Sequence, residues 1–427
     1  MAGEWATKRI GDLGRVVTGK TPSTAVAENF GGNYPFITIP DMDGRREISA
    51  SARTLSEQGA QSLRTCRLPA GAVMMSCIAT IGNCGITTRP SFTNQQINSL
   101  ICGNDADPKF VYYCFSQLGH ALEAAGGGGS VYTNVSKSRF EEIELTLPPL
   151  AEQKAIAAVL GALDDKIELN RRMNATLEAM ARALFQSWFV DFDPVRAKLD
   201  GRPPAALDPA TATLFPDSFQ ESALGEIPHG WRLGTLGELV QLRTDRVDAT
   251  PAKDSTRYIA LEDMPSKSID LSNFQLGSAV NSSITAFRKG DVLFGSMRPY
   301  FHKVGLAFFD GITRTTTFVL RPRKDCFRHF ALLHFFSDDV VAHSTTASVG
   351  TTIPYVRWDS MESYRVPIPP DSLLEAFDKT VSPLVQRIAA QGEESRTLAT
   401  LRDTLLPKLL SGELSVAAAS ATMEASA

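Results

Sequence analysis

The fold of this 427-residue chain is decided by residues 147–195, LPPLAEQKAIAAVLGALDDKIELNRRMNATLEAMARALFQSWFVDFDPV. After Pro148-Pro149, seam positions recur at alternating steps of four and three, which places them on one stripe of a helix, as in a coiled coil. The seam residues are Ile156, Leu160, Leu163, Ile167, Asn170, Asn174, Leu177, Ala181, Leu184 and Trp188. The two asparagines form a polar break, which is expected to fix helix register at some cost in stability.

The same seam returns 221 positions later in the chain. Its residues are Phe377, Val381, Leu384, Ile388, Gln391, Ser395, Leu398, Arg402, Leu405 and Leu409. One such helix alone fits an ordinary core helix equally well. Two helices with matching seams and matching polar breaks favour pairing with each other, antiparallel, as a spacer of roughly 60 Å for about 40 residues.

The flanking segments also repeat in order. Trp5 opens W-x4-I-G-D-L and Trp231 opens W-x4-L-G-E-L. LPAGAVMMS (68–76) corresponds to FRKGDVLFG (287–295), and SVYTNVSKSRFEEIELTLPPL (130–150) corresponds to TTIPYVRWDSMESYRVPIPPD (351–371). An ordered series of this kind indicates two related lobes.

Each lobe mixes strand-like and helix-like segments. YPFITI (34–39) and DVLFGS (291–296) are strand-like runs between turn residues, whereas FVYYCFSQL (110–118) and HFALLHFFS (329–337) are helix-like. We therefore expect an α+β protein, with two pseudo-repeated mixed α/β domains joined by two long helices. The expected order is a first lobe (1–148), a spacer helix (149–192), a surface linker (193–225), a second lobe (226–369), a second spacer helix (370–414) and a disordered tail (415–427).

The charge distribution permits nucleic-acid binding without demonstrating it. The net charge of −4 argues mildly against such binding. However, residues 1–148 carry no net charge and residues 226–369 carry +2, while each of the other two segments carries −3. No apolar run reaches the ~20 residues of a membrane helix, the N-terminal residues lack a signal core, and the six cysteines form no CxxC pair. A cytoplasmic location is expected.

Motifs for catalysis are missing. GRVVTGKT (14–21) matches the phosphate-binding pattern GxxxxGK[ST], but Pro22 opposes the helix that this site needs. The Pro-Pro sites at 147–150 and 368–371 lack the amide and the aromatic residue of a DNA methyltransferase loop. The acidic pairs Asp164-Asp165 and Asp191/Asp193 suit a solvated or docking surface better than a metal site. We therefore expect no catalytic residue, metal or bound cofactor. A self-sufficient enzyme is disfavoured, and a two-lobed protein–protein adaptor remains the alternative.

The layout resembles the specificity subunit of type I restriction–modification enzymes over nearly the whole chain. The most specific parts are residues 147–195 and TLATLRDTLLPKLLSGEL (397–414), which are similar to the family's two conserved helical regions. TGKTPS (18–23) with FGGNYPFITIPDM (30–42) is similar to its first strand–loop segment. The resemblance implies a non-catalytic subunit whose two target-recognition domains each read half of a split, asymmetric site in double-stranded DNA. It also implies helices that dock two modification subunits, a restriction subunit as a further partner, and S-adenosylmethionine and ATP on those partners only.

Base recognition needs hydrogen-bonding side chains on loops, since Arg and Lys read guanine, Asn and Gln read adenine, and Ser and Thr read either. Both lobes carry such residues at corresponding places of the repeat. The DNA-contact candidates in the first lobe are Lys20, Thr21, Ser76, Thr80, Asn94, Gln95, Gln96, Tyr132 and Asn134. Those in the second lobe are Arg298, Tyr300, His302, Lys303, Arg314, Thr315 and Thr316.

Overall fold

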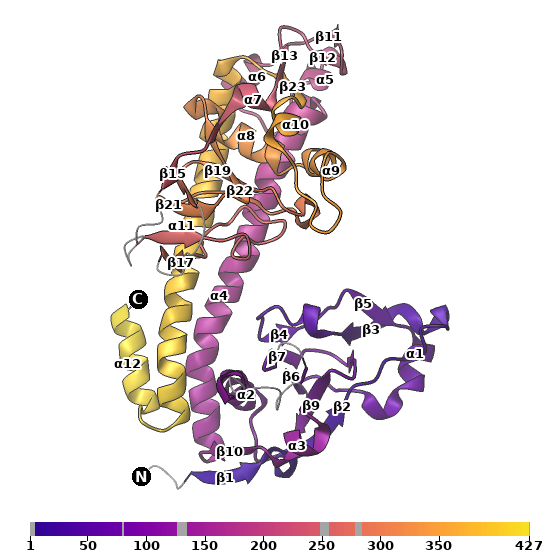
Figure 1. Ribbon diagram of the computed structural model, residues 1–427, viewed down its shortest axis with the longest axis vertical. Coiled ribbons are helices and arrows are strands. Elements are labelled where there is room, and N and C mark those ends of the chain that lie inside the picture. Colours follow the sequence, from indigo (N-terminus) through magenta and orange to yellow (C-terminus); the bar gives the residue numbers. More distant parts are fainter. Residues whose placement is uncertain (1–4, 79–80, 126–134, 248–255, 278–283, 427) are drawn as a thin grey trace. The chain divides into compact units, whose positions relative to one another are not determined.

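Two long helices, α4 (Leu150–Phe185) and α11 (Asp371–Leu410), form where the two heptad patterns lie (Figure 1). The computed structural model describes residues 1–427 apart from 1–4, 79–80, 126–134, 248–255, 278–283 and 427. The chain divides into one unit of residues 1–168 with 398–427 and another of residues 169–397. Each unit therefore holds one lobe and one portion of both helices.

The described residues of the first lobe form three sheets. The largest has the order β2-β9-β6-β7-β4, formed by β2 (Gly14–Thr18), β9 (Ile97–Cys102), β6 (Val73–Ser76), β7 (Cys84–Thr87) and β4 (Glu47–Ile48). The second has the order β5-β3-β8, formed by β5 (Arg53–Leu55), β3 (Phe30–Ile37) and β8 (Phe92–Thr93). The third pairs β1 (Ala6–Arg9) with β10 (Glu144–Leu147).

The second lobe has a corresponding set of sheets. One has the order β14-β22-β19-β20, formed by β14 (Val240–Arg243), β22 (Thr317–Pro322), β19 (Val292–Gly295) and β20 (Val304–Leu306). Another has the order β15-β18-β21-β16-β17, formed by β15 (Arg246–Val247), β18 (Ile284–Phe287), β21 (Gly311–Arg314), β16 (Arg257–Ile259) and β17 (Gln275–Leu276). Two-stranded sheets pair β13 (Arg232–Thr235) with β23 (Arg365–Ile368), and β11 (Phe219–Ser222) with β12 (Gly225–Pro228).

The two lobes repeat one topology. The order β2-β9-β6-β7 in the first corresponds to β14-β22-β19-β20 in the second, and the pair β1–β10 corresponds to β13–β23. The strands β3 and β16 also correspond, because each has a parallel neighbour, β8 or β21, and an antiparallel neighbour, β5 or β17. The pseudo-repeat expected from the sequence is confirmed.

Helices close each core. The first lobe has α1 (Glu57–Ser62), α2 (Pro108–Ala125) and α3 (Lys137–Glu142), and the second has α7 (Leu236–Leu239), α8 (Arg328–Phe335), α9 (Asp338–Thr346) and α10 (Trp358–Glu362). In the first unit, Phe110 of α2 lies in one buried cluster with Leu160 of α4 and Leu405 of α11. In the second unit, Phe330 of α8 shares a cluster with Phe377 of α11. The spacer helices are thus part of both cores.

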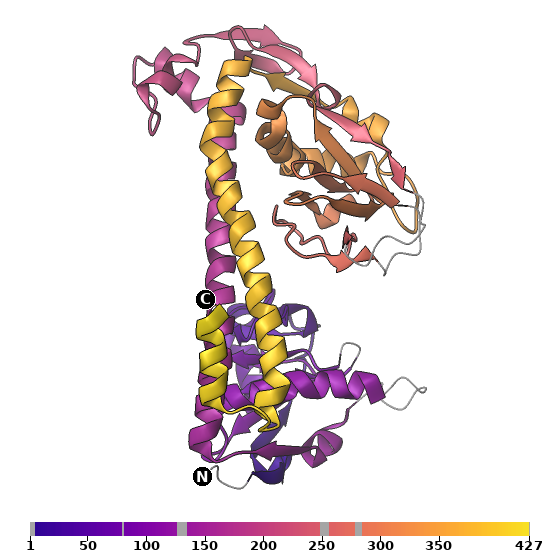
Figure 2. The same cartoon turned by 90° about the vertical axis from the view of Figure 1, so that its left-hand side faces the viewer.

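The predicted seams face inward, and the helices are antiparallel. The seam residues Ile156, Leu160, Leu163, Asn170, Asn174, Phe377, Val381, Ile388 and Leu405 are buried, and Ile167, Leu177, Leu184, Leu384 and Leu398 are half-buried. The Asn170 amide nitrogen lies 2.8 Å from the Glu394 carboxylate, whereas that of Asn174, one turn further along α4, lies 3.4 Å from the carbonyl oxygen of Ile388. Residues 371–397 of α11 run beside 169–185 of α4 in Figure 2.

The expectation of a disordered C-terminal tail was wrong. The expected disordered tail contains helix α12 (Val416–Ser426), because its alanine-rich sequence favours a helix and the Ser415 hydroxyl accepts a hydrogen bond from the Ala418 amide. Ala419 on this helix is buried in the first unit's core. The linker expected on the surface contains α5 (Asp193–Leu199) and α6 (Pro209–Thr213). It also buries Phe215 against Trp188, with ring centroids 5.2 Å apart.

Candidate nucleic-acid interface

In the first lobe, three candidate loops meet at one edge of the large sheet. β2 pairs antiparallel with β9, with Thr18 opposite Asn98, and β6 pairs antiparallel with β9, with Ser76 opposite Ile97. The end of β2, the start of β9 and the end of β6 therefore lie together. We call residues 19–21, which follow β2, and residues 94–96, which precede β9, the first loop edge. The loop after β6 lies beside them.

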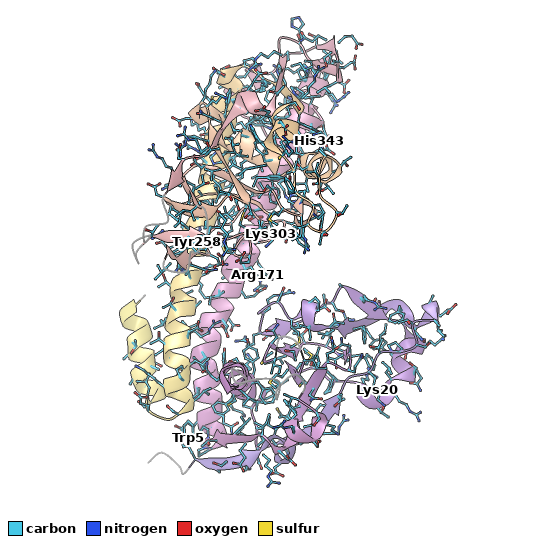
Figure 3. The ribbon with its side chains drawn as sticks, in the orientation of Figure 1. Trp5, Lys20, Arg171, Tyr258, Lys303 and His343 are labelled. Atoms are coloured by element: carbon cyan, nitrogen blue, oxygen red, sulfur yellow. The ribbon has the colours of Figure 1, made fainter. Side chains whose placement is uncertain are left out.

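The two segments of the first loop edge contact each other. The Thr21 hydroxyl donates a hydrogen bond to the Gln95 side-chain oxygen at 2.8 Å, and the Asn94 amide donates one to Gln96 at 3.0 Å. Gly19 allows this approach, because a Cβ built there would lie 2.1 Å from the Asn94 carbonyl oxygen. Lys20 and Gln95 are exposed beside these contacts (Figure 3 labels Lys20). Hydroxyl, amide and ammonium groups from distant parts of the sequence are thus brought together.

Ser76 does not belong to this exposed set. Its side chain is buried, and its hydroxyl accepts a hydrogen bond from the Asn83 amide at 3.0 Å, so it stabilises the turn after β6. A small polar residue at a strand end satisfies backbone groups as readily as it reads a base, which is why the sequence could not separate the two roles. The candidates Thr80, Tyr132 and Asn134 lie outside the described residues.

The second lobe forms an equivalent edge with equivalent backbone hydrogen bonds. In the first lobe the Cys77 amide donates to the Gln96 carbonyl at 2.8 Å, and the Val135 amide donates to the Cys77 carbonyl at 3.0 Å. In the second lobe the Ser296 amide donates to the Thr316 carbonyl at 3.0 Å, and the Val356 amide donates to the Ser296 carbonyl at 2.9 Å. We call residues 297–303 and 314–316 the second loop edge.

Side chains on the second loop edge divide into exposed and buried ones. Arg298, Tyr300 and Thr315 are exposed. The Lys303 ammonium is half-buried and donates to the Leu261 carbonyl at 2.7 Å, and burial lowers its pKa (Figure 3). Arg314 and Thr316 are half-buried, with the Arg314 guanidinium 5.9 Å from the Tyr258 ring.

His302 was expected on the DNA surface, but its ring is buried. One ring nitrogen lies 2.8 Å from the Phe336 carbonyl oxygen, and the ring packs against Phe336 with centroids 4.7 Å apart. Burial lowers the pKa of the imidazole. The backbone turn around His302 directs its side chain into the lobe, so it anchors the loop instead of facing solvent.

Sequence reasoning missed two kinds of residue at these edges. Asn98 is buried and donates to the Val135 carbonyl at 3.2 Å, while its side-chain oxygen accepts from Thr18 at 2.6 Å. It therefore joins β2, β9 and the segment at Val135. Phe301 and Tyr355 are exposed aromatic residues near Tyr300. The sequence analysis already placed Tyr300 on this turn, and Phe301 is its neighbour in the chain.

An ion-pair network around the buried Arg46 attaches the first lobe to the helices. The Arg46 guanidinium, 5% exposed, lies 2.6 Å from Asp165 of α4 and 3.3 Å from the Tyr113 hydroxyl. Asp164 accepts a hydrogen bond from Tyr113 and pairs with Arg402 of α11 at 2.8 Å. The acidic pair that the sequence placed on a solvated or docking face thus makes structural contacts within this unit.

The described residues form no arrangement typical of a catalytic centre. Among them, no group of His, Cys, Asp or Glu side chains could hold a metal ion, and no helix is long and apolar enough to cross a membrane. The GRVVTGKT segment enters strand β2, and residues 19–23 after it are not helical, so the phosphate-binding arrangement is not formed. What the two edges offer is hydrogen-bond donors and acceptors on loops held by a rigid sheet.

Comparisons with known proteins agree along the chain. A family model described as "Type I restriction modification DNA specificity domain" matches residues 2–179. The type I restriction enzyme MjaIX specificity subunit of Methanocaldococcus jannaschii is 27% identical over 434 residues, covering 97% of this chain and 94% of the relative. The HindI specificity subunit of Haemophilus influenzae is 35% identical over 176 residues, covering 40% and 38%. In fold, the S subunit crystal structure from M. genitalium matches with a TM-score of 0.51 at 18% identity, covering 95% of this chain and 96% of that one.

Proposed function

Since this chain belongs to the family of type I restriction–modification specificity subunits, we propose that its two lobes each read one half of a split, asymmetric site in double-stranded DNA. The chain is the DNA-recognition subunit of such a system, has no catalytic role of its own and assembles with other subunits. The observation that carries the proposal is the pair of loop edges. They occupy the same place in the repeated topology yet present different side chains.

The chemistry of each edge supports base recognition. The first loop edge offers the amide of Gln95 and the ammonium of Lys20, and the second offers the guanidinium of Arg298 and the hydroxyl of Thr315. Amides pair with adenine, and cations pair with guanine or phosphate. Because the two sets differ, the half-sites should differ in sequence. The residues that we propose to contact DNA are Lys20, Thr21, Asn94, Gln95, Arg298 and Thr315.

The helices are the proposed docking surface for two modification subunits. Leu169, Met173 and Met180 of α4 are apolar yet exposed, at helical spacing. Exposed apolar residues in a row are typical of a protein interface. A restriction subunit is proposed as a further partner. S-adenosylmethionine and ATP are proposed to bind to those partners only, and a cytoplasmic location follows from this assembly.

Methylation mapping tests the proposal. The chain is co-expressed with its modification subunits in a host that lacks other DNA methylation, and methylated adenines are mapped by long-read sequencing. A split motif with a constant gap should appear, and it should be lost when this chain is omitted. Replacing residues 226–369 with the second lobe of a relative should change one half of the motif only.

The matched control exchanges residues 1–148 instead, which should change the other half of the motif. Methylation at the same sites without this chain would contradict the proposal. The two-lobed adaptor would then be the better account, because an adaptor joins proteins without selecting a DNA sequence.

A further inference from the structure

Residues 298–302 form a turn with unusual backbone geometry at the second loop edge. Arg298 and His302 both adopt left-handed conformations, with φ of 48° and 53°. Non-glycine residues rarely do so, and such strain is often found at functional sites. The Arg298 amide donates to the Pro354 carbonyl at 2.7 Å, and the buried His302 ring contacts the Phe336 carbonyl. The turn is thus fixed at both ends.

Between these fixed ends, two aromatic side chains point away from the core. Tyr300 is 49% exposed and Phe301 is 44% exposed, and their rings contact each other edge to face with centroids 4.9 Å apart. Val349, Ile353 and Tyr355 are also exposed, and Tyr355 is bridged to both Met297 and Val349. These residues make an apolar patch on the surface of the lobe, and patches of this kind usually mark binding sites.

The surroundings of the patch favour DNA as its occupant. Ser296, at the base of the turn, donates to the Thr316 carbonyl through both its amide and its hydroxyl, so the turn that carries the patch is joined to residues 314–316 of the second loop edge. The exposed Arg298 guanidinium lies 6.0 Å from the Phe301 ring and pairs with no carboxylate in the described part of the chain. A cation next to exposed aromatic rings suits phosphates next to stacked bases.

We propose that Tyr300 and Phe301 form a wedge that enters the second half-site and unstacks one base step. This inference rests on the proposed function and adds a mode of recognition, in which the second lobe reads how easily the DNA deforms. Apolar and aromatic wedges cost unstacking energy, which is lowest at flexible pyrimidine–purine steps. Residues 79–83 of the first lobe, ATIGN, correspond to this turn and contain no aromatic residue, so the first half-site should stay stacked.

The test uses the assembled modification complex without S-adenosylmethionine and duplexes that carry the mapped motif. 2-Aminopurine, which fluoresces more strongly when unstacked, replaces each purine of the site in turn, the methylated adenine excepted. We expect a several-fold increase at one step of the second half-site and none in the first. Phe301→Ala should abolish the increase and weaken binding about ten-fold, whereas Tyr300→Phe, which keeps the ring, should bind like the unaltered complex.

Leu276→Ala is the matched control, because Leu276 is an apolar residue of the same lobe that is 51% exposed and lies outside the patch. It should change neither fluorescence nor affinity, and thermal unfolding of all variants should be unchanged. Specific binding without any unstacked step, or loss of binding in Tyr300→Phe, would overturn the wedge and leave the proposed function intact. A complex that does not distinguish the motif from a scrambled duplex would overturn both.

Discussion

The side-chain amide of Asn170 donates a hydrogen bond to the backbone carbonyl of Gln391, 3.5 Å away and 221 positions later in the sequence. That separation equals the offset between the two heptad seams, so the two residues occupy equivalent positions in the repeat. The antiparallel helices therefore meet at corresponding points of their own pattern. In such a pair, a polar residue at this point fixes the register, because any slip would leave its amide without acceptors.

We expect Asn170→Asp to lower the free energy of unfolding by about 3 kcal/mol at neutral pH. The amide nitrogen of Asn170 also lies 2.8 Å from the Glu394 carboxylate and 3.2 Å from the Ser395 hydroxyl, and a carboxylate would replace these contacts with repulsion and a buried charge. Urea unfolding followed by circular dichroism measures the loss. Asn273→Asp, at an exposed position, is the control. A loss as small as that of the control would show that Asn170 does not hold the register.

Glu178 of α4 is expected to make the second unit less stable as pH rises. Its carboxyl group accepts hydrogen bonds from the Ser268 hydroxyl at 2.6 Å and the Ile269 amide at 3.2 Å, but burial raises its pKa from 4.5 to about 7. At pH values between 4.5 and about 7, the Glu178 carboxyl group is ionised in the unfolded chain but stays protonated in the folded chain. The free energy of unfolding therefore falls with rising pH, by at most about 1.4 kcal/mol per pH unit.

Glu178→Gln keeps both hydrogen-bond acceptor contacts and removes the titration, so its unfolding free energy should fall less between pH 5 and 7. The neighbouring Asp270, whose pKa burial also raises, should retain its own share of the slope. Glu393→Gln, which alters an exposed carboxylate on the paired helix, is the matched control variant. Equal slopes for Glu178→Gln and the unaltered chain would mean that Glu178 is ionised in the folded state.

Two adjacent arginines should differ strongly in their effect on stability. The Arg46 side chain is 5% exposed, and its guanidinium pairs with Asp165 and lies 3.9 Å from Asp164, which is 12% exposed. Arg46→Ala removes the cation beside this largely buried carboxylate and should cost about 3 kcal/mol. The Arg45 side chain is 32% exposed, and its pair with Asp43 should be worth under about 1 kcal/mol. Chemical denaturation of both variants provides the comparison. Similar losses would show that Arg46 makes no special contribution to attaching the lobe.

The sequence predicted the helices and the repeat better than the local structure of the connections. The seams could be predicted because apolar residues such as Leu160 and Leu405 belong to patterns with helical period whose apolar side faces a core. Long periodic patterns of this kind are a strong sequence signal for helices. The segment after Ser415 was misassigned, because alanine-rich composition is equally typical of helices and of tails. Its helix is stabilised by packing at Ala419, which composition does not reveal.

Candidate DNA contacts were predicted by type and loop position, which cannot tell an exposed side chain from a buried one. Lys20 and Arg298 are exposed as expected. Ser76 and His302 have the right chemistry, but one stabilises a turn and the other turns inward through a left-handed backbone. The exposed Phe301 was not predicted because its side chain, unlike that of Tyr300, has no hydrogen-bonding group.

Gly19→Ala should impair recognition by the first lobe alone. The added methyl group would lie 2.1 Å from the Asn94 carbonyl and 2.3 Å from that of Thr93, so residues 19–21 and 94–96 must separate. We expect the contact between Thr21 and Gln95 to be lost and methylation at the first half-site to fall about ten-fold, the effect of losing 1.4 kcal/mol. The sequence requirement at the second half-site should stay the same.

Gly103→Ala is the matched control, because Gly103 directly follows β9 at the opposite edge of the same sheet and its nearest neighbour, the Leu13 carbonyl, would be 3.3 Å from the new carbon. A general loss of folding in Gly19→Ala would be seen as a lower unfolding temperature. In that case Lys20→Ala, which alters an exposed side chain only, should still weaken binding and reduce its dependence on salt, because a phosphate or base contact by a cation releases counterions. Full recognition of the first half-site in both variants would exclude the first loop edge from DNA reading.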